Sequence, residues 1–146
     1  MIIKGVHIHG MKGAQRSLKR QKKAFVKLGL PGAKEFFHGT INIDTSPFEY
    51  TIVKFDFLFR DVKHKSFPRK RIEDFGFIEI LELVHNNIRY EKWGYLYFPH
   101  KSPHFNKDNM FEMVGSELRY IEQNGIFEIK INEGRLKIRN NNGSRL

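Results

Sequence analysis

Short runs of β-branched and aromatic residues, separated by turn signals, recur along almost the whole chain. Chains with this pattern form several short strands, which pack as a sandwich or close into a barrel. Only residues 15–29 have the three-to-four-residue spacing of apolar positions that is typical of an amphipathic helix. The pattern therefore predicts a mainly β (α+β) fold: a small β-barrel with one helix near its start and short helical insertions.

The expected strands follow the alternation of apolar and polar residues. They cover residues 2–9, 41–43, 48–59, 75–84, 88–98, 126–131 and 136–138. Asn86 and Asn87 predict a tight hairpin turn. A second turn, at residues 132–134, predicts that the last strand pairs back on the one before it. Residues 60–74 are expected to form an exposed loop, and residues 110–120 a short helix or a strand followed by a helix.

The predicted helix is basic on much of its surface. Leu18, Phe25 and Leu28 form its apolar stripe, and Gly29 is expected to end it. The basic side chains are Arg16, Lys19, Arg20, Lys22, Lys23 and Lys27. They indicate either a solvated face near a polyphosphate site or a surface for nucleic acid.

The overall composition favours one basic domain with anionic partners. With 146 residues and a net charge of +10, we expect a single domain over residues 1–139 and a flexible tail over residues 140–146. The chain has no cysteine, which excludes disulfides and thiolate chemistry. No apolar stretch approaches the ~18 residues that span a bilayer, and the start lacks the pattern of a signal peptide. We therefore expect a cytoplasmic protein with no membrane partner.

A glycine, a hydroxyl and an amide come together at Gly39, Thr40 and Asn42. In an extended backbone, residues 40 and 42 point to the same side, and glycine lets another molecule approach the chain closely. Two such oxygens suit a hard cation beside a phosphate. The same residues also fit an ordinary strand start in which Asn42 completes a turn.

The order of motifs along residues 1–131 resembles the archaeal CTP-dependent riboflavin kinases. The matching pieces are residues 6–13, Ser17-Leu18, Leu28-Gly29, Gly39-Thr40-Ile41-Asn42, Phe75-Gly76, residues 94–99, Ser102-Pro103-His104, residues 111–114, Leu118-Arg119 and residues 124–129. The chain differs from the family pattern at His38, in the loop at residues 10–15 and at residues 102–104. The resemblance implies a six-stranded barrel of the cradle-loop type.

The resemblance also implies an activity: transfer of the γ-phosphoryl group of CTP to riboflavin, giving FMN and CDP, with Mg²⁺. Thr40 and Asn42 match the family's metal ligands, and Ser102 and Glu112 match its flavin contacts. The implied nucleotide-binding residues are Gly10, Met11, Lys12, Gly13, Ala14, Gln15, Ser116, Glu117, Leu118 and Arg119. Glu112 is either a contact of the flavin or the catalytic base on the attacking hydroxyl.

Other candidate site residues allow two interpretations each. His7 with His9, and His100 with His104, are either metal ligands or solvated side chains. The aromatic pairs Phe36-Phe37 and Tyr95/Tyr97 either stack on a ligand ring or fill the core. No Walker motif is present, because Lys12 is misplaced and no hydroxyl follows it. The alternative to a kinase is a non-enzymatic nucleic-acid-binding module on the same barrel.

Overall fold

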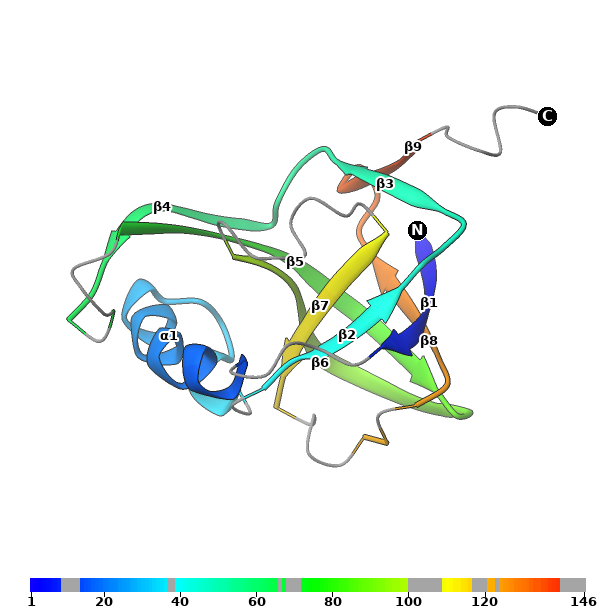
Figure 1. Ribbon diagram of the computed structural model, residues 1–146, viewed down its shortest axis with the longest axis horizontal. Coiled ribbons are helices and arrows are strands. Elements are labelled where there is room, and N and C mark those ends of the chain that lie inside the picture. Colours follow the sequence, from blue (N-terminus) through cyan, green and yellow to red (C-terminus); the bar gives the residue numbers. More distant parts are fainter. Residues whose placement is uncertain are drawn as a thin grey trace.

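The computed structural model describes residues 1–8, 14–36, 39–65, 67, 72–99, 109–116, 121–122 and 124–139. Strands dominate it, as Figure 1 shows. In chain order the elements are β1 Ile2–Ile8, α1 Ala14–Leu28, the 3-10 helix η1 Ala33–Glu35, β2 Ile41–Asp44, β3 Glu49–Ile52, β4 Phe57–Lys63, β5 Ile72–His85, β6 Ile88–Pro99, β7 Met110–Gly115, β8 Ile126–Ile131 and β9 Leu136–Arg139.

Six antiparallel strands close into a barrel in the order β5-β6-β7-β2-β1-β8. Closure depends on the long strand β5, which pairs with β6 from Phe75 to His85. In addition, the first part of β5 pairs with β4, and its last part, from Ile80 to His85, pairs with β8. β4 extends the sheet beyond β5, and β3 and β9 form a separate two-stranded ribbon. The predicted six-stranded barrel with one basic helix is therefore confirmed.

Two apolar cores share the wall of the barrel between them. The interior core is filled by alternate residues of the barrel strands, among them Ile41 and Ile43 of β2 and Phe111 and Met113 of β7. The second core lies on the outer face, where α1 packs over β5 and β6. Because strand side chains alternate between faces, residues next to the interior ones point outward, and those of β5 and β6, such as Phe75, Phe77 and Tyr97, pack under α1.

The amphipathic pattern of α1 explains how it docks on the sheet. Leu18 and Phe25 are fully buried, and Phe25 meets the rings of Phe75 and Phe77 edge-on at centroid distances of 4.9 and 5.1 Å. Leu28, expected on the same stripe, is 38% exposed, whereas Leu30, just after the helix, is buried in the same core. Gly29 ends the helix with a left-handed φ of 83°, as predicted.

The structure corrects several predicted elements. Residues 48–59 form not one strand but β3 and the start of β4, because the chain leaves the ribbon after Ile52 to join the barrel sheet. The predicted loop at residues 60–74 contains the end of β4 and the start of β5. Of residues 110–120, the described part through Gly115 is strand β7. β9 pairs with β3 and not with β8.

The hairpin between β5 and β6 matches its prediction. Asn86 and Asn87 both have positive φ angles, 50° and 63°, and His85 pairs with Ile88 across the turn. The described part of the chain has no helix that is both long and apolar enough to cross a membrane. The predicted tail, residues 140–146, lies outside the described residues.

Candidate functional site

Thr40 and Asn42 lie at the start of β2, on the face of the barrel wall that looks outward. Ile41 and Ile43 point into the interior core, so Asn42 points the other way. Its side chain is 4% exposed. The oxygens Thr40 Oγ1 and Asn42 Oδ1 are both buried, and neither has a hydrogen-bond partner among the described residues. Buried polar atoms without partners are costly, so such a pair marks a place where a ligand would stabilise the fold.

A carboxylate stands next to this amide. Glu112 of β7 is the register partner of Asn42, so their side chains are neighbours on the same face of the sheet. Burial raises the pKa of the Glu112 carboxyl to about 7, because the charged form loses its hydration. The group is therefore able to gain or lose a proton near neutral pH.

Tyr97 of β6 continues the row on the other side of Glu112. Its hydroxyl donates a hydrogen bond to Gln21 Oε1 of α1 at 2.5 Å, and its ring meets Phe25 at a centroid distance of 5.8 Å. Burial raises the pKa of Tyr97, and the nearby charges of Glu112 and Glu73 raise it further. The helix therefore covers one end of a polar row that runs from Asn42 through Glu112 to Tyr97.

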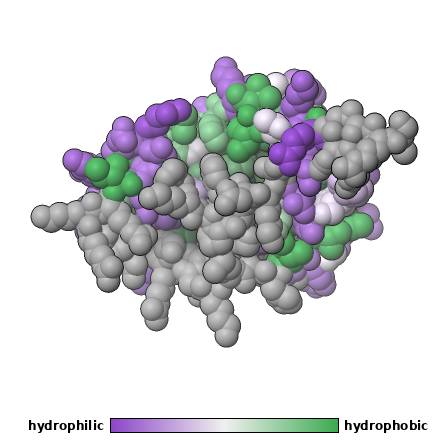
Figure 2. Space-filling model, turned by 45° about the horizontal axis from the view of Figure 1, so that its top comes forward, coloured by the Kyte–Doolittle hydropathy of each residue, from purple (hydrophilic) through white to green (hydrophobic). Residues whose placement is uncertain are grey.

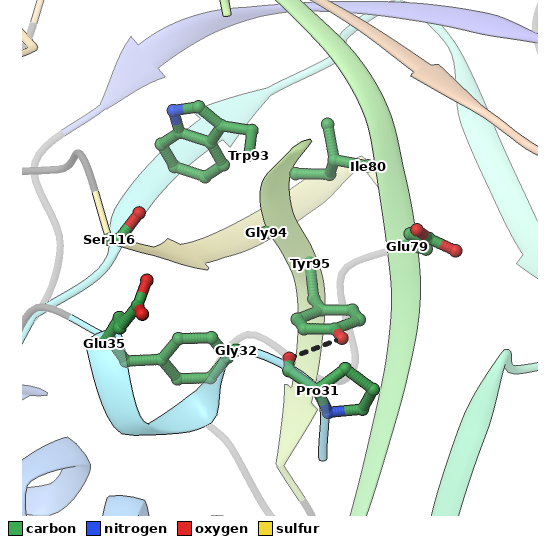
Figure 3. Close-up of a pocket in the computed structure, with 10 residues that line it drawn as sticks. Pro31, Gly32, Glu35, Glu79, Ile80, Trp93, Gly94, Tyr95 and Ser116 are labelled. Carbon is green, nitrogen blue, oxygen red and sulfur yellow. Dashed lines mark hydrogen bonds between the residues drawn. The ribbon is translucent and has the colours of Figure 1, made fainter. Parts of the chain in front are cut away.

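A cavity of about 350 Å³ opens on the same face, close to this row. Figure 3 shows it between the segment after α1 and the strands β5, β6 and β7. Its lining residues are Pro31, Gly32, Glu35, Phe36, Glu79, Ile80, Trp93, Gly94, Tyr95 and Ser116. A space of this size is typical of sites for small molecules.

Aromatic and acidic side chains define the cavity. Phe36 meets Tyr95 at a centroid distance of 5.9 Å, and the Tyr95 hydroxyl donates a 2.8 Å hydrogen bond to the Pro31 carbonyl (Figure 3). Desolvation, followed by the charges of Glu79 and Asp56, raises the pKa of Tyr95 to about 12. In Figure 3 the carboxylate of Glu35 points towards Ser116, whereas that of Glu79 points away from it.

The strand register places the cavity beside Thr40. Asn42 is opposite Glu112, and Tyr95 is opposite Val114. Continuing the β2–β7 register by two residues places Thr40 opposite Val114, one pair away from the Asn42–Glu112 pair. Two residues along a strand span about 7 Å, so Thr40 lies near the strands that border the cavity, although neither Thr40 nor Asn42 lines it.

These residues are suited to a hard cation and an anionic ligand. Mg²⁺ prefers oxygen ligands and keeps several waters, so a hydroxyl and an amide oxygen with no described partner fit its requirements. Among the described residues, no group of three His, Asp or Glu side chains forms a metal site. The oxygens that the site offers to a cation are Thr40 Oγ1 and Asn42 Oδ1, with the carboxyl of Glu112 beside them.

The structure brings together part of the predicted site. Thr40, Asn42 and Glu112 lie on one face, Ser116 lines the cavity, and Ala14 and Gln15 form the first residues of α1. The remaining predicted contacts lie outside the described residues: Gly10, Met11, Lys12, Gly13, Ser102, Glu117, Leu118 and Arg119. The same holds for His9, Phe37, His38, His100 and His104.

Some of the residues at the site were not predicted. Phe36, Tyr95 and Tyr97 are buried, which confirms their core role, but Phe36 and Tyr95 also line the cavity, which the sequence did not indicate. The sequence did contain a sign that Gln21 is special, because Gln21 is a polar residue on the apolar stripe of the helix. The sequence contains no such sign for Glu35 and Glu79. They are exposed glutamates 44 residues apart in the sequence, and only the fold shows that they border one cavity.

Comparison with known proteins adds no assignment. No protein-family model matches the chain, and no curated protein matches it.

Proposed function

We propose that this protein is a phosphotransferase of the CTP-dependent riboflavin kinase type, acting in the cytoplasm. It would transfer the γ-phosphoryl group of CTP to the ribityl hydroxyl of riboflavin, giving FMN, CDP and a proton. One observation carries the proposal: the buried oxygens of Thr40 and Asn42 lack partners among the described residues and lie beside Glu112. These are the residues that the family resemblance assigns to the metal and the flavin.

Thr40 and Asn42 would hold Mg²⁺ through their side-chain oxygens. When bound, the ion would neutralise charge on the phosphate oxygens of the nucleotide. Phosphoryl transfer otherwise needs little from a protein except correct positioning. The cover that α1 provides through Gln21 and Tyr97 would keep this end of the polar row away from water.

Glu112 would act on riboflavin, the proposed phosphoryl acceptor. As a base, it would take the proton of the ribityl hydroxyl while the oxygen–phosphorus bond forms and the bond to CDP breaks. A pKa of about 7 suits that role, because the group is both partly ionised and basic at neutral pH. As a binding residue, it would accept a hydrogen bond from the flavin. Both roles require the same position next to Asn42.

The cavity would receive a planar ring. Trp93, Tyr95 and Phe36 give it aromatic walls, and Ser116 begins the segment that the resemblance assigns to the nucleotide. Residues 10–15 would supply further nucleotide contacts, and Ser102 a flavin contact. A ring in this cavity would lie close to Thr40 and Asn42, as substrate and metal must in phosphoryl transfer.

The test is formation of FMN from riboflavin, CTP and Mg²⁺, followed by flavin chromatography. We expect the Thr40→Ala/Asn42→Ala variant to lose at least ~100-fold in rate, because it lacks the oxygens that position the charge-neutralising ion. The control is Thr51→Ala/Asn124→Ala, which changes an exposed threonine and an exposed asparagine and should retain wild-type activity.

A second measurement separates binding from catalysis. Added Mg²⁺ and CDP should raise the thermal unfolding midpoint of the wild type and of the control, because a ligand that binds only the folded state stabilises it. The Thr40→Ala/Asn42→Ala variant should show no such rise. Folded wild-type protein that makes no FMN with CTP or any other nucleotide would refute the proposed function.

A further inference from the structure

A second charged surface lies apart from the buried oxygens and the cavity. Five lysines are exposed and form no ion pair with another described residue: three on α1, one at the end of β4 and one just after β4. We name them the lysine surface: Lys19, Lys23, Lys27, Lys63 and Lys65. In Figure 2 hydrophilic side chains gather over the left end of the molecule, the end where Figure 1 places β4 and α1.

Aromatic packing brings the two parts of this surface together. Phe67, which follows β4, is buried in the core under α1 and contacts Phe75 at a centroid distance of 5.8 Å. Phe75 in turn packs against Phe25 of α1. The rings of His64 and Phe67 lie at a centroid distance of 5.9 Å. This packing holds residues 63–65 next to the helix.

The electrostatics of His64 agree with this packing. Desolvation lowers the pKa of its imidazole, and the positive charges of Lys27, Lys65 and Lys23 lower it further. Lysines from positions about forty residues apart in the sequence therefore act on one side chain. Because these like charges repel one another, a bound anion would relieve their repulsion.

The geometry of the lysine surface favours an extended anion. Lys19, Lys23 and Lys27 are four residues apart on α1, which spaces them about 6 Å apart along a row of about 12 Å. A single phosphate cannot span that row. Most of the apolar face of α1 is buried against the barrel and, among its described apolar side chains, only Val26 and Leu28 are partly exposed, so the helix has little apolar surface to insert into a membrane. Repeated phosphates along a rigid strand match the row better than a lipid surface does.

We propose that the lysine surface binds the phosphate backbone of nucleic acid, independently of the proposed phosphotransfer site. Lysines contact phosphates as point charges and carry no sequence information by themselves. The interaction is therefore expected to be independent of sequence and strongly dependent on salt, because each neutralised phosphate releases counterions.

The experiment measures binding of the full chain to a short fluorescent duplex at several salt concentrations. If about five phosphates are neutralised, the slope of log K against log salt is roughly −4 to −5. The Lys23→Gln/Lys27→Gln variant should reduce its magnitude by about 2, one for each lost contact. The control Lys130→Gln/Lys137→Gln makes the same change in net charge on exposed residues of β8 and β9 and should keep the wild-type slope.

A second readout reports on the place of binding. Phosphates at the lysine surface should raise the pKa of His64, measured from its ring signals by NMR with and without the duplex. Equal slopes for the two double variants, no binding at low salt, or binding to vesicles of anionic lipid but not to the duplex would overturn the proposal. Thr40→Ala/Asn42→Ala should still bind the duplex, so failure of the kinase assay and failure of this proposal are distinguishable.

Discussion

At the scale of single residues, the site combines groups that are expensive to bury. The oxygens of Thr40 and Asn42 lack partners among the described residues, and Glu112 is held where its charged form is disfavoured. A core selected for stability alone would place apolar side chains there. Several energetically unfavourable polar groups buried close together are typical of functional sites.

The raised pKa of Glu112 makes a prediction about stability and pH. Without Mg²⁺ or ligands, the free energy of unfolding should fall as pH rises from about 4.5 to above 7, because the folded state keeps a proton that the unfolded state loses. The loss is of order 3 kcal/mol, from about 1.4 kcal/mol per pKa unit. Urea denaturation of the wild type at pH 5 and pH 8 measures it.

Substitution of the carboxyl isolates this effect. Glu112→Gln cannot ionise, so its unfolding free energy should change less between the two pH values and should exceed that of the wild type at pH 8. The control Glu122→Gln removes a carboxyl from an exposed position and should keep the wild-type dependence. A stability of Glu112→Gln that falls as steeply as that of the wild type would show that another group is responsible.

At the scale of elements, α1 connects the site to the lysine surface. Its buried face docks through Phe25, Gln21 of the helix accepts the Tyr97 hydrogen bond, and its exposed face carries Lys19, Lys23 and Lys27. The same helix therefore contributes to the core, to the polar row and to the lysine surface. Loosening of its docking should affect the site and the lysine surface together.

Truncation of Phe25 tests the docking of the helix. Phe25→Ala should lower the free energy of unfolding by about 3–5 kcal/mol, the usual cost of removing a buried aromatic ring. Its neighbour Val26 is 44% exposed, so Val26→Ala should cost far less. Chemical denaturation measures both variants, and equal losses would contradict the packing described for α1.

At the scale of the whole molecule, closure of the barrel depends on a close approach of two strands. Gly94 of β6 is paired with Gly115 of β7, next to the cavity. A Cβ atom at Gly94 would lie 2.0 Å from the carbonyl oxygen of Val114, which is backbone and cannot move aside unless the strands separate. The absence of a side chain here is therefore a requirement of closure.

Gly94→Ala should consequently prevent folding or lower stability more than Gly76→Ala. At Gly76 the added Cβ would meet the ring of Phe55 at 2.4 Å, and that side chain can rotate away. Circular dichroism and thermal unfolding of the two variants test the difference. A Gly94→Ala protein as stable as Gly76→Ala would show that β6 and β7 do not approach as closely as described.

Local pattern determined several features correctly. The alternation of apolar residues predicted most of the strands, the helical period predicted α1, and Asn86, Asn87 and Gly29 predicted a turn and a helix end. Each of these depends on a residue's own backbone preference and its near neighbours, which the sequence displays directly. The proximity of Thr40 and Asn42 also follows from local alternation.

Tertiary structure alone decided how the elements meet. Pairing of β9 with β3, the break between β3 and β4, and the position of Glu112 beside Asn42 depend on which strands become neighbours. So do the contact of Gln21 with Tyr97 and the proximity of Lys23 and Lys27 to Lys65. Strand neighbours are chosen by the total burial and hydrogen bonding of the closed barrel, to which residues far apart in the chain contribute together. Strand neighbours therefore cannot be predicted from any local stretch of this sequence.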